Sequence, residues 1–207
     1  NDRIPVNYPS KWDVMVVKNF KRKCESEVNS VRPGITPLCY ALRECTDENT
    51  MFFSDMTQFA YVAKEVIPMD FPNLWHHPYG FGTLGFALPA AIGGALGKPN
   101  TPIIAIAGDY GFQYTIQELA TAVELKLSIP IILWDNNKLK EIEDSMQSAQ
   151  IAPNSVKALN PDFCQLAIAY GASSALPKDI KEFKAEVLKA FSNDVPTLIY
   201  LTNDILI

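Results

Sequence analysis

The amino-acid sequence predicts an α/β fold, a doubly wound parallel sheet with helices on both faces. Short apolar runs rich in β-branched residues recur along the chain, as expected for strands that are buried on both faces. Helical patterns separate these runs, which gives the alternating order of strands and helices typical of this class. With 207 residues, of which 48% are hydrophobic, the chain is long enough to bury a core.

Four of the apolar runs are expected to be strands, at residues 51–55, 102–109, 129–135 and 197–202. Helices are expected near residues 11–28, 35–45, 57–66, 85–97, 115–126, 161–170 and 179–192. The charged start of the chain is followed by Arg-Pro-Gly, so residues 1–30 are expected to be a lead-in helix and linker. Residues 31–207 then form the domain that contains the sheet.

Residues 102–135 predict a strand, a helix and a second strand. Thr115 and Glu118 form a T-x-x-E capping box, which predicts that the helix begins there. Its core face is expected to consist of Ile116, Leu119, Ala120 and Val123. The two strands of such a unit run parallel, so both end at the same edge of the sheet.

Polar side chains stand where these two strands end. Asp109 follows the first strand, and Asp135, Asn136 and Asn137 follow the second. This edge is where open α/β sheets bind ligands, and its oxygens suit Mg²⁺ that shares its ligands with phosphates. The helix that opens after Asp109 would direct N–H groups at the same phosphates. A magnesium-diphosphate site is therefore expected; the alternative is that Asp109 caps a helix and the asparagines form a loop.

Two other phosphate motifs match only in part. The run GFGTLG, residues 80–85, has the glycine spacing of a dinucleotide-binding turn, but HHPY precedes it where a strand is required. Gly97 and Lys98 resemble the end of a P-loop, but Pro99 and Ile92 occupy positions that need a hydroxyl residue and a glycine. A dinucleotide-binding domain remains an alternative reading of the first motif.

The pattern of apolar strand, Gly-Asp-x-Gly, helix, apolar strand and Asn-Asn resembles the diphosphate and magnesium motif of thiamine diphosphate-dependent enzymes. The upstream run GFGTLGFALPAAIGGALG resembles the segment that holds the cofactor's pyrimidine in that family, and the resemblance extends over roughly residues 35–202. The runs EIEDSM and PDFCQLAIAYG resemble acetolactate synthase-like decarboxylases, in particular those that act on 5-guanidino-2-oxopentanoate.

The resemblance implies a role for several residues at the cofactor's phosphates. Mg²⁺ would be bound by the side chains of Asp109 and Asn136 and by the backbone carbonyl of Lys138. The N–H groups of Gly111 and Phe112 would bind the diphosphate. These residues make up the implied anchoring site.

The resemblance also implies contacts on the thiamine side. Leu84 would prop the cofactor in its bent form and the carbonyl of Gly82 would accept the pyrimidine amino group, which brings that group close to the thiazolium carbon. Residues 55–57 would form a second phosphate-side loop, in which Thr57 donates its hydroxyl. The alternative for Leu84 is an ordinary core residue.

Three departures from the family pattern cluster at this site. Tyr110 replaces a glycine, Asp135 replaces the first of two asparagines, and Lys138 and Leu139 replace a glycine and a tyrosine. If the glycine were needed for positive φ or a close phosphate approach, Tyr110 would cost about 1–3 kcal/mol or would block the ligand. Asp135 could instead add negative charge near Mg²⁺, and Lys138 could contact phosphate. A non-catalytic relative with an eroded site is therefore the alternative to a working enzyme.

The resemblance further implies what the chain lacks. In the family, a glutamate that activates the pyrimidine belongs to an N-terminal domain, usually of a partner subunit, and nothing before residue 30 resembles it. The chain begins with Asn and resembles roughly the C-terminal third of such an enzyme. We therefore expect it to be inactive alone, and to act on a 2-oxo acid in a homo-oligomer that supplies the missing domain.

Other polar residues allow two interpretations. His76 and His77 are adjacent, so in a strand they point to opposite sides and a structural role is expected for each. Glu141 and Glu143 could recognise a cationic substrate tail such as a guanidinium, or could interact with a helix dipole. The tryptophans are expected in the core or at an interface, and they are Trp12, Trp75 and Trp134.

Charge and cysteine content exclude several classes. A net charge of −5 disfavours nucleic acid as a partner, and the basic cluster is expected to be the solvated face of a helix: Lys18, Lys21, Arg22 and Lys23. The cysteines have no metal-ligand or CxxC spacing, which favours a reducing cytoplasm. The longest uncharged stretch is broken by glycines and a proline, so no membrane span is expected.

Overall fold

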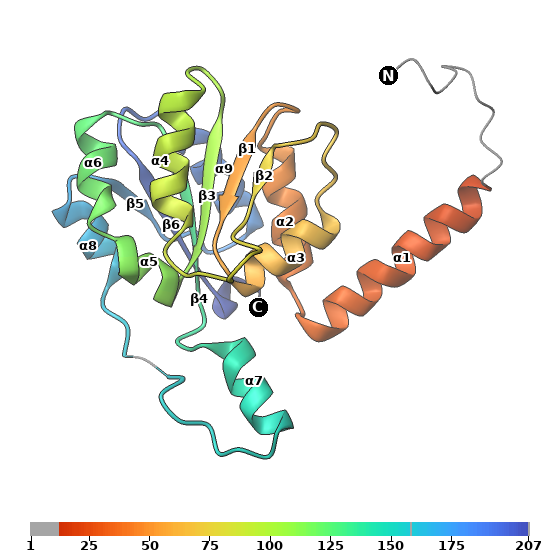
Figure 1. Ribbon diagram of the computed structural model, residues 1–207. Coiled ribbons are helices and arrows are strands. Elements are labelled where there is room, and N and C mark those ends of the chain that lie inside the picture. The colour runs from red at the N-terminus through yellow and green to blue at the C-terminus, as the bar shows by residue number, and fades with distance from the viewer. Residues whose placement is uncertain (1–12, 158, 207) are drawn as a thin grey trace.

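A parallel sheet forms the centre of the computed structural model, which describes residues 13–157 and 159–206. Over these residues the sheet has six strands in the order β2-β1-β3-β4-β6-β5, and each neighbouring pair is parallel. The strands are β1 Met51–Ser54, β2 Trp75–His76, β3 Ile103–Gly108, β4 Pro130–Asp135, β5 Ser173–Ala175 and β6 Thr197–Thr202. The predicted doubly wound α/β fold is confirmed (Figure 1).

Helices cover both faces of this sheet (Figure 1). The helices that pack on one face are α2 Ile35–Glu44, α3 Gln58–Val66 and α9 Ile180–Ala190. Those on the other face are α4 Ala87–Gly97, α5 Asp109–Thr115, α6 Glu118–Glu124 and α8 Phe163–Ala169. The remaining elements are α1 Val14–Val31, α7 Lys140–Ser148 and the 3₁₀ turn η1 Asn203–Leu206.

The strands contribute to two cores because successive side chains point to opposite faces. On β3, Ile104 and Ile106 belong to the core with α2, α3 and α9, whereas Ile103 and Ala105 belong to the core with α4 and α6. All six residues of β3 and of β4 are buried. This explains why the central strands read as continuous apolar runs.

The four predicted strands are observed to within one or two residues, and two further strands were not predicted. β2 and β5 are only two and three residues long, too short for a periodic pattern, and they lie at the two edges of the sheet. The predicted helix ranges did not include α7, and α5 was expected only as a helix that opens after Asp109, without a range of its own. Because α5 begins directly at the end of β3, it fixes the direction of the chain at the candidate site.

The predicted capping box at Thr115 is wrong. The chain is already helical from Asp109 to Thr115, so Thr115 ends one helix and does not cap the next; its buried hydroxyl has no hydrogen-bond partner among the residues that the structure covers. α6 begins at Glu118 after a short turn. This shift also moves the buried face, since Leu119 and Ala122 are buried while Ala120 is exposed.

The predicted lead-in helix is observed as α1. It carries no buried residue and extends away from the sheet in Figure 1. The boundary of the domain near residue 30 stays a prediction, and Trp12 lies outside the described residues. Trp75 and Trp134 belong to or border the core, as expected.

Helix α4 approaches strand β1 closely at Gly94. A Cβ atom placed there would lie 2.4 Å from the ring of Phe53, which cannot easily retreat because it is buried and stacks on His76 with ring centroids 4.6 Å apart. We expect Gly94→Ala to lower the free energy of unfolding by about 1–3 kcal/mol through overpacking. Urea denaturation followed by circular dichroism measures this.

The neighbouring Gly93 provides the matched control, because a Cβ atom there meets no atom within 4 Å. Gly93→Ala should raise the free energy of unfolding by about 0.5–1 kcal/mol through helix propensity alone. Equal effects of the two substitutions would contradict the close packing at Gly94.

Candidate functional site

The ends of β3 and β4 lie side by side at one edge of the sheet. Gly108 pairs with Trp134 in the parallel register, so the next residues, Asp109 and Asp135, emerge at the same level. Asp109, and Asn136 directly after Asp135, border a cavity of about 220 Å³. Its walls include the predicted site residues Thr57, Gly82, Leu84, Asp109, Gly111, Asn136 and Lys138.

The carboxylates of Asp109 and Asp135 are bridged by one amide. Nδ2 of Asn160 donates to Oδ2 of Asp109 at 2.8 Å and to Oδ1 of Asp135 at 2.9 Å. Gln113 orients this amide, because its Nε2 donates to Oδ1 of Asn160 at 3.1 Å. The hydroxyl of Tyr200 donates to the other oxygen of Asp135 at 2.8 Å. Both oxygens of Asp135 are therefore engaged, whereas Oδ1 of Asp109 accepts no side-chain hydrogen bond within the described ranges.

Asn136 is held by its amide nitrogen, which donates to Oε1 of Gln58 at 2.9 Å. Its Oδ1 accepts the backbone N–H of Lys138 at 3.2 Å. Asn136 lies on the cavity wall beside Asp109. A carboxylate oxygen and an amide oxygen thus border the same space, and these are the hard ligands that Mg²⁺ prefers.

Asp109 is buried, with 4% of its surface exposed. Burial raises the pKa of its carboxyl from 3.8 to about 6, and the nearby charge of Asp135 adds to the shift, while the hydrogen bond from Asn160 opposes it. Without a cation, the charged form of Asp109 is therefore destabilised by its surroundings. This is the electrostatic situation expected of a side chain that faces a bound cation.

This shift makes stability depend on pH. As the pH rises from 3.8 to about 6, Asp109 loses its proton in the unfolded chain before it does in the folded one, so the free energy of unfolding falls. Asp109→Asn removes this contribution and can still accept the hydrogen bond from Asn160. In metal-free urea denaturation, we expect the variant's stability advantage to be absent below about pH 4, to grow up to about pH 6 and then to stay constant. An advantage that does not change with pH would contradict the raised pKa.

The carboxylate of Asp55, the first residue of the loop at 55–57, is directed at the start of α4. Its carboxylate accepts three backbone N–H groups at the start of α4, from Gly85 at 3.2 Å, Phe86 at 2.7 Å and Ala87 at 2.9 Å. Burial raises the pKa of Asp55, and these three donors oppose the shift. A Cβ atom on Gly111 would lie 2.3 Å from Oδ2 of Asp55, so this contact also requires a glycine on α5.

The loop between β2 and α4 places Gly82 and Leu84 on the cavity wall. Gly82 has φ +63°, and a Cβ atom there would lie 2.8 Å from the end of Met56. Leu84 is only partly buried and borders the cavity, so it is not an ordinary core residue. Thr57 also borders it. A dinucleotide-binding turn at residues 80–85 would need a strand directly before it. The strand β2 ends at His76 and the next helix, α4, begins at Ala87, so no strand leads directly into these residues.

The first turn of α5 supplies backbone N–H groups at the cavity. The first four N–H groups of a helix, here those of Gly108 to Gly111, have no partner within the helix, whereas that of Phe112 is the first that can form one. Gly111 is therefore better placed than Phe112 to bind an anion. Phe112 is a core residue that packs edge-on against Phe163 at 5.9 Å.

Tyr110 carries no backbone strain. It lies in the first turn of α5 and is not among the residues with positive φ. The cost that the sequence analysis attached to this position under the positive-φ condition therefore does not arise. Its side chain borders the cavity.

The structure separates the two glutamates of α7. Glu143 is buried and forms an ion pair of 2.9 Å with Lys138, so the amine of Lys138 is engaged by this carboxylate. Glu141 borders the cavity and forms an ion pair of 3.1 Å with Arg32. Only Glu141 is thus placed to meet a ligand.

The adjacent histidines have structural contacts. His76 stacks on Phe53, and Nδ1 of His77 lies 2.9 Å from the hydroxyl of Ser54. Burial, with the nearby Lys64, lowers the pKa of His77 to about 4. Neither residue borders the cavity at Asp109.

The sequence analysis did not identify Asn160 or Gln58, which position the two candidate metal ligands. Asn160 directly precedes the PDFCQLAIAYG run that carried part of the resemblance. Its proximity to Asp109 depends on how the chain returns from α7, which no local pattern reveals. Gln58 directly follows Thr57 at the start of α3, and this is a signal that could have identified it.

Features of two other kinds of site are absent from the described residues. Within residues 13–157 and 159–206, no helix is both long and apolar enough to cross a membrane. Over the same residues, no three side chains of His, Cys, Asp or Glu gather as a metal-binding group. A site at Asp109 would therefore need amide, backbone or ligand oxygens besides its single carboxylate.

Most of the chain matches one known family model. Residues 55–201 match the family model described as thiamine pyrophosphate enzyme, C-terminal TPP binding domain. The matched residues contain the ends of both central strands, the loop at Gly82 and Leu84, and α7.

Proteins with similar sequences are described as a decarboxylase and a synthase. The chain is 43% identical over 149 residues to a probable 2-ketoarginine decarboxylase of Pseudomonas aeruginosa, a match that covers 72% of this chain and 27% of the relative. It is 31% identical over 170 residues to the large subunit of acetolactate synthase isozyme 1 of Escherichia coli, covering 81% and 30%. The chain thus spans less than a third of the length of these relatives.

Solved structures show the same fold. Benzoylformate decarboxylase from Polynucleobacter necessarius superposes with a TM-score of 0.75 at 24% identity, over 83% of this chain and 33% of that one. The 4-hydroxybenzoylformate decarboxylase of Rhodococcus jostii gives a TM-score of 0.75 at 23% identity, over 81% and 32%. The α/β architecture is therefore shared with these decarboxylases.

Proposed function

This chain belongs to the thiamine pyrophosphate enzymes, and we propose that it binds thiamine diphosphate together with Mg²⁺ as part of a 2-oxo acid decarboxylase or acetolactate synthase-like lyase. The observation that carries the proposal is the position of Asp109 and Asn136 at adjacent strand ends on the wall of one cavity. The raised pKa of Asp109 supports a cation there, because a positive charge would relieve the cost of burying its carboxylate.

Different residues of the chain would bind Mg²⁺ and the diphosphate. Asp109 and Asn136 would hold Mg²⁺ with their side-chain oxygens, and Lys138 with its backbone carbonyl, while Gly111 would donate its N–H to the diphosphate. When bound, the cofactor supplies a thiazolium carbon that can hold the carbanion left by loss of CO₂.

On the thiamine side, Leu84 would support the bent cofactor from the cavity wall, and the carbonyl of Gly82 would accept the pyrimidine amino group. Thr57 would donate its hydroxyl to the phosphates. These three roles act through positioning. The support for them is that all three residues border the same cavity as Asp109.

The departures from the family pattern are compatible with binding. Tyr110 has helical backbone geometry, and the buried carboxylate of Asp135 is stabilised by hydrogen bonds from Asn137, Asn160 and Tyr200. Lys138 directs its amine to Glu143. We therefore favour a working cofactor site over an eroded one.

The proposal extends to the substrate and to the oligomeric assembly. The relative at 43% identity is described as a probable 2-ketoarginine decarboxylase, and 2-ketoarginine is 5-guanidino-2-oxopentanoate, so we propose a 2-oxo acid with a guanidinium tail. The activating glutamate would come from an N-terminal domain, usually of a second subunit in a homo-oligomer, so this chain alone would be inactive. The free state of all four cysteines supports a cytoplasmic location.

The direct test is a calorimetric titration of the chain with thiamine diphosphate, with and without Mg²⁺. Binding that requires Mg²⁺ is expected. Binding that is the same in excess chelator would contradict the proposed role of Asp109 and Asn136, and NAD binding without Mg²⁺ would favour the dinucleotide alternative at residues 80–85.

Tyr110→Gly distinguishes a working site from an eroded relative. Because Tyr110 is unstrained, we expect the substitution to lower stability by about 1 kcal/mol through helix propensity and to leave cofactor affinity within about tenfold, or ~1.4 kcal/mol. Calorimetry and urea denaturation measure the two effects. A gain in affinity well beyond tenfold would show that Tyr110 blocks the site.

A further inference from the structure

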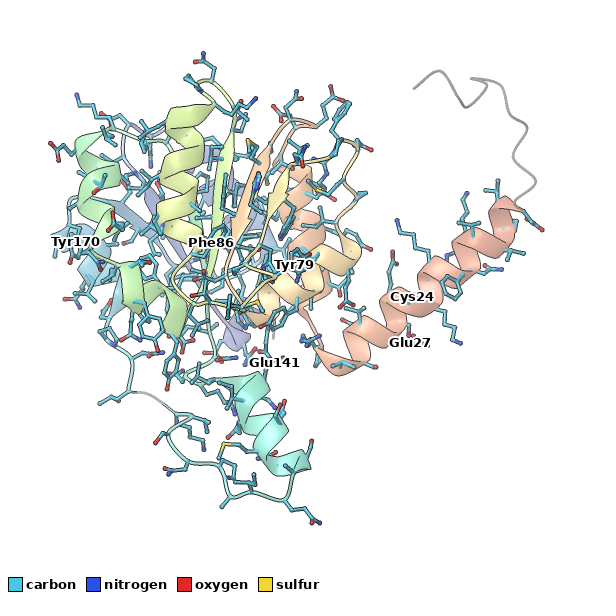
Figure 2. The ribbon with its side chains drawn as sticks, viewed as in Figure 1. Cys24, Glu27, Tyr79, Phe86, Glu141 and Tyr170 are labelled. Atoms are coloured by element: carbon cyan, nitrogen blue, oxygen red, sulfur yellow. The ribbon has the colours of Figure 1, made fainter. Side chains whose placement is uncertain are left out.

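The carboxylate of Glu141 already binds a guanidinium group, that of Arg32. Nε and Nη2 of Arg32 donate to Oε1 of Glu141 at 3.3 and 3.1 Å. The two residues are 109 positions apart in the chain. Figure 2 shows Glu141 at the end of α7 nearest the sheet.

The other acidic residues of α7 are neutralised locally. Glu143 pairs with Lys138, and Asp144 pairs with Lys140. Among the described residues, Glu141 forms no ion pair with a lysine; its partner is Arg32, directly after α1. It is therefore the acid of α7 that pairs with a cation from a distant part of the chain.

An aromatic ring completes the guanidinium contact. Cζ of Arg32 lies 5.2 Å from the centroid of the Tyr61 ring, within the range of a cation–π interaction. A carboxylate at the edge and an aromatic ring at the face form a combination that suits a planar guanidinium. The amine of Lys64 also lies near this ring, at 5.4 Å.

Both contact groups border the cavity at Asp109. Tyr61 and Glu141 line it together with the apolar side chains of Leu139 and Ile142. They also line the adjoining hollow that contains Arg32. The guanidinium of Arg32 thus contacts the residues that separate the cofactor cavity from this hollow.

We propose that Glu141 and Tyr61 select a substrate with a guanidinium tail, and that Arg32 occupies their binding site until the substrate displaces it. The inference rests on the proposed function, which places the reacting end of the substrate in the cavity at Asp109. Arg32 stands in for the substrate's tail, with the same planar cation on the same two groups. Apolar neighbours such as Ile142 would pack against the methylene chain.

The test uses the 207-residue chain and 4-guanidinobutanoate as the probe, which has the tail but no reacting 2-oxo group. The control probe is 4-ureidobutanoate, its neutral isostere. Calorimetry should show that Arg32→Ala binds the guanidino probe at least about fivefold more tightly than the wild type, because the internal competitor is gone. Adding Glu141→Gln should then weaken binding at least about tenfold.

Matched variants separate recognition from general charge effects. Tyr61→Phe keeps the aromatic face and should bind the probe as the parent does, whereas Tyr61→Leu should bind it severalfold more weakly. Glu44→Gln removes a carboxylate from an exposed pair with Lys184 elsewhere and should change nothing. Equal binding of the two probes, no binding by any variant, or no effect of Glu141→Gln would each overturn the inference.

The outcome is independent of the cofactor proposal. Thiamine diphosphate and Mg²⁺ are titrated into the same Arg32→Ala and Glu141→Gln variants, which should bind them as the wild type does. If the guanidino probe binds selectively while the cofactor does not, the proposed function fails and the guanidinium site stands. The reverse result overturns the guanidinium site alone.

Discussion

Asp109→Ala is expected to abolish Mg²⁺-dependent binding of thiamine diphosphate to this chain. The substitution removes a buried carboxylate on the cavity wall whose Oδ1 accepts no hydrogen bond from a side chain of the described residues. Loss of even an indirect contact to a metal ligand costs about 10–100-fold in affinity, so removal of the ligand itself should cost more than about 100-fold. Calorimetry at saturating Mg²⁺ measures it.

Asp135→Asn is the matched control, because it removes a neighbouring charge without removing a proposed ligand. Asp135 uses both oxygens for Asn137, Asn160 and Tyr200, and an asparagine is what the family pattern has at this position. We expect affinity within about tenfold of the wild type. If both variants lose binding equally, the effect is one of local charge, and Asp109 has no specific role.

Asp55→Ala is expected to lower the free energy of unfolding by about 3–5 kcal/mol, since it leaves three backbone N–H groups without their acceptor. These groups belong to Gly85, Phe86 and Ala87, and Asp55 is 1% exposed. The loss should also loosen the loop that carries Leu84, so cofactor affinity should fall together with stability. Urea denaturation and calorimetry on one preparation measure the two effects.

Two variants show whether buried acceptors cause this loss. Asp55→Asn retains one acceptor oxygen and should have intermediate stability. Asp162→Ala removes an exposed helix cap that accepts one backbone N–H, from Gln165 at 2.9 Å, and the side-chain amide of the same residue; it should cost about 1 kcal/mol. Similar losses for Asp55→Ala and Asp162→Ala would contradict the special role of Asp55.

The central part of the fold was predictable because burial on both faces leaves a clear pattern. Strands β3 and β4 read as apolar runs, and chain connectivity then requires that they be parallel and end at one edge. The meeting of Asp109 and Asn136 follows from these two facts. A helix opening after Asp109 was expected, but its end at Thr115 was not, because Gly-Asp-Tyr-Gly has low helix propensity and gives no periodic pattern that marks the extent of the helix.

Contacts between residues far apart in the sequence could not be predicted from local sequence patterns. Asn160 reaches Asp109 and Asp135 from 51 and 25 positions away, after a segment whose path no periodicity specifies. Glu141 and Glu143 lie two positions apart and so face different sides of α7. Which of them faces the cavity depends on how α7 is rotated against the sheet, and this is set by the buried pair of Glu143 with Lys138.

The segment between Lys138 and Lys157, which contains α7, is closed where its two ends meet. Lys138 forms an antiparallel bridge with Lys157, and the N–H of Leu139 donates to the carbonyl of Val156 at 2.8 Å. The two ends of this segment are thus hydrogen-bonded to each other outside the sheet. Since the entropy of closing a loop grows slowly with its length, the part beyond this tie can be lengthened, shortened or exchanged at little cost to the rest. Related proteins could therefore differ in the substrate tail that they recognise through changes in this segment alone, while the sheet stays the same.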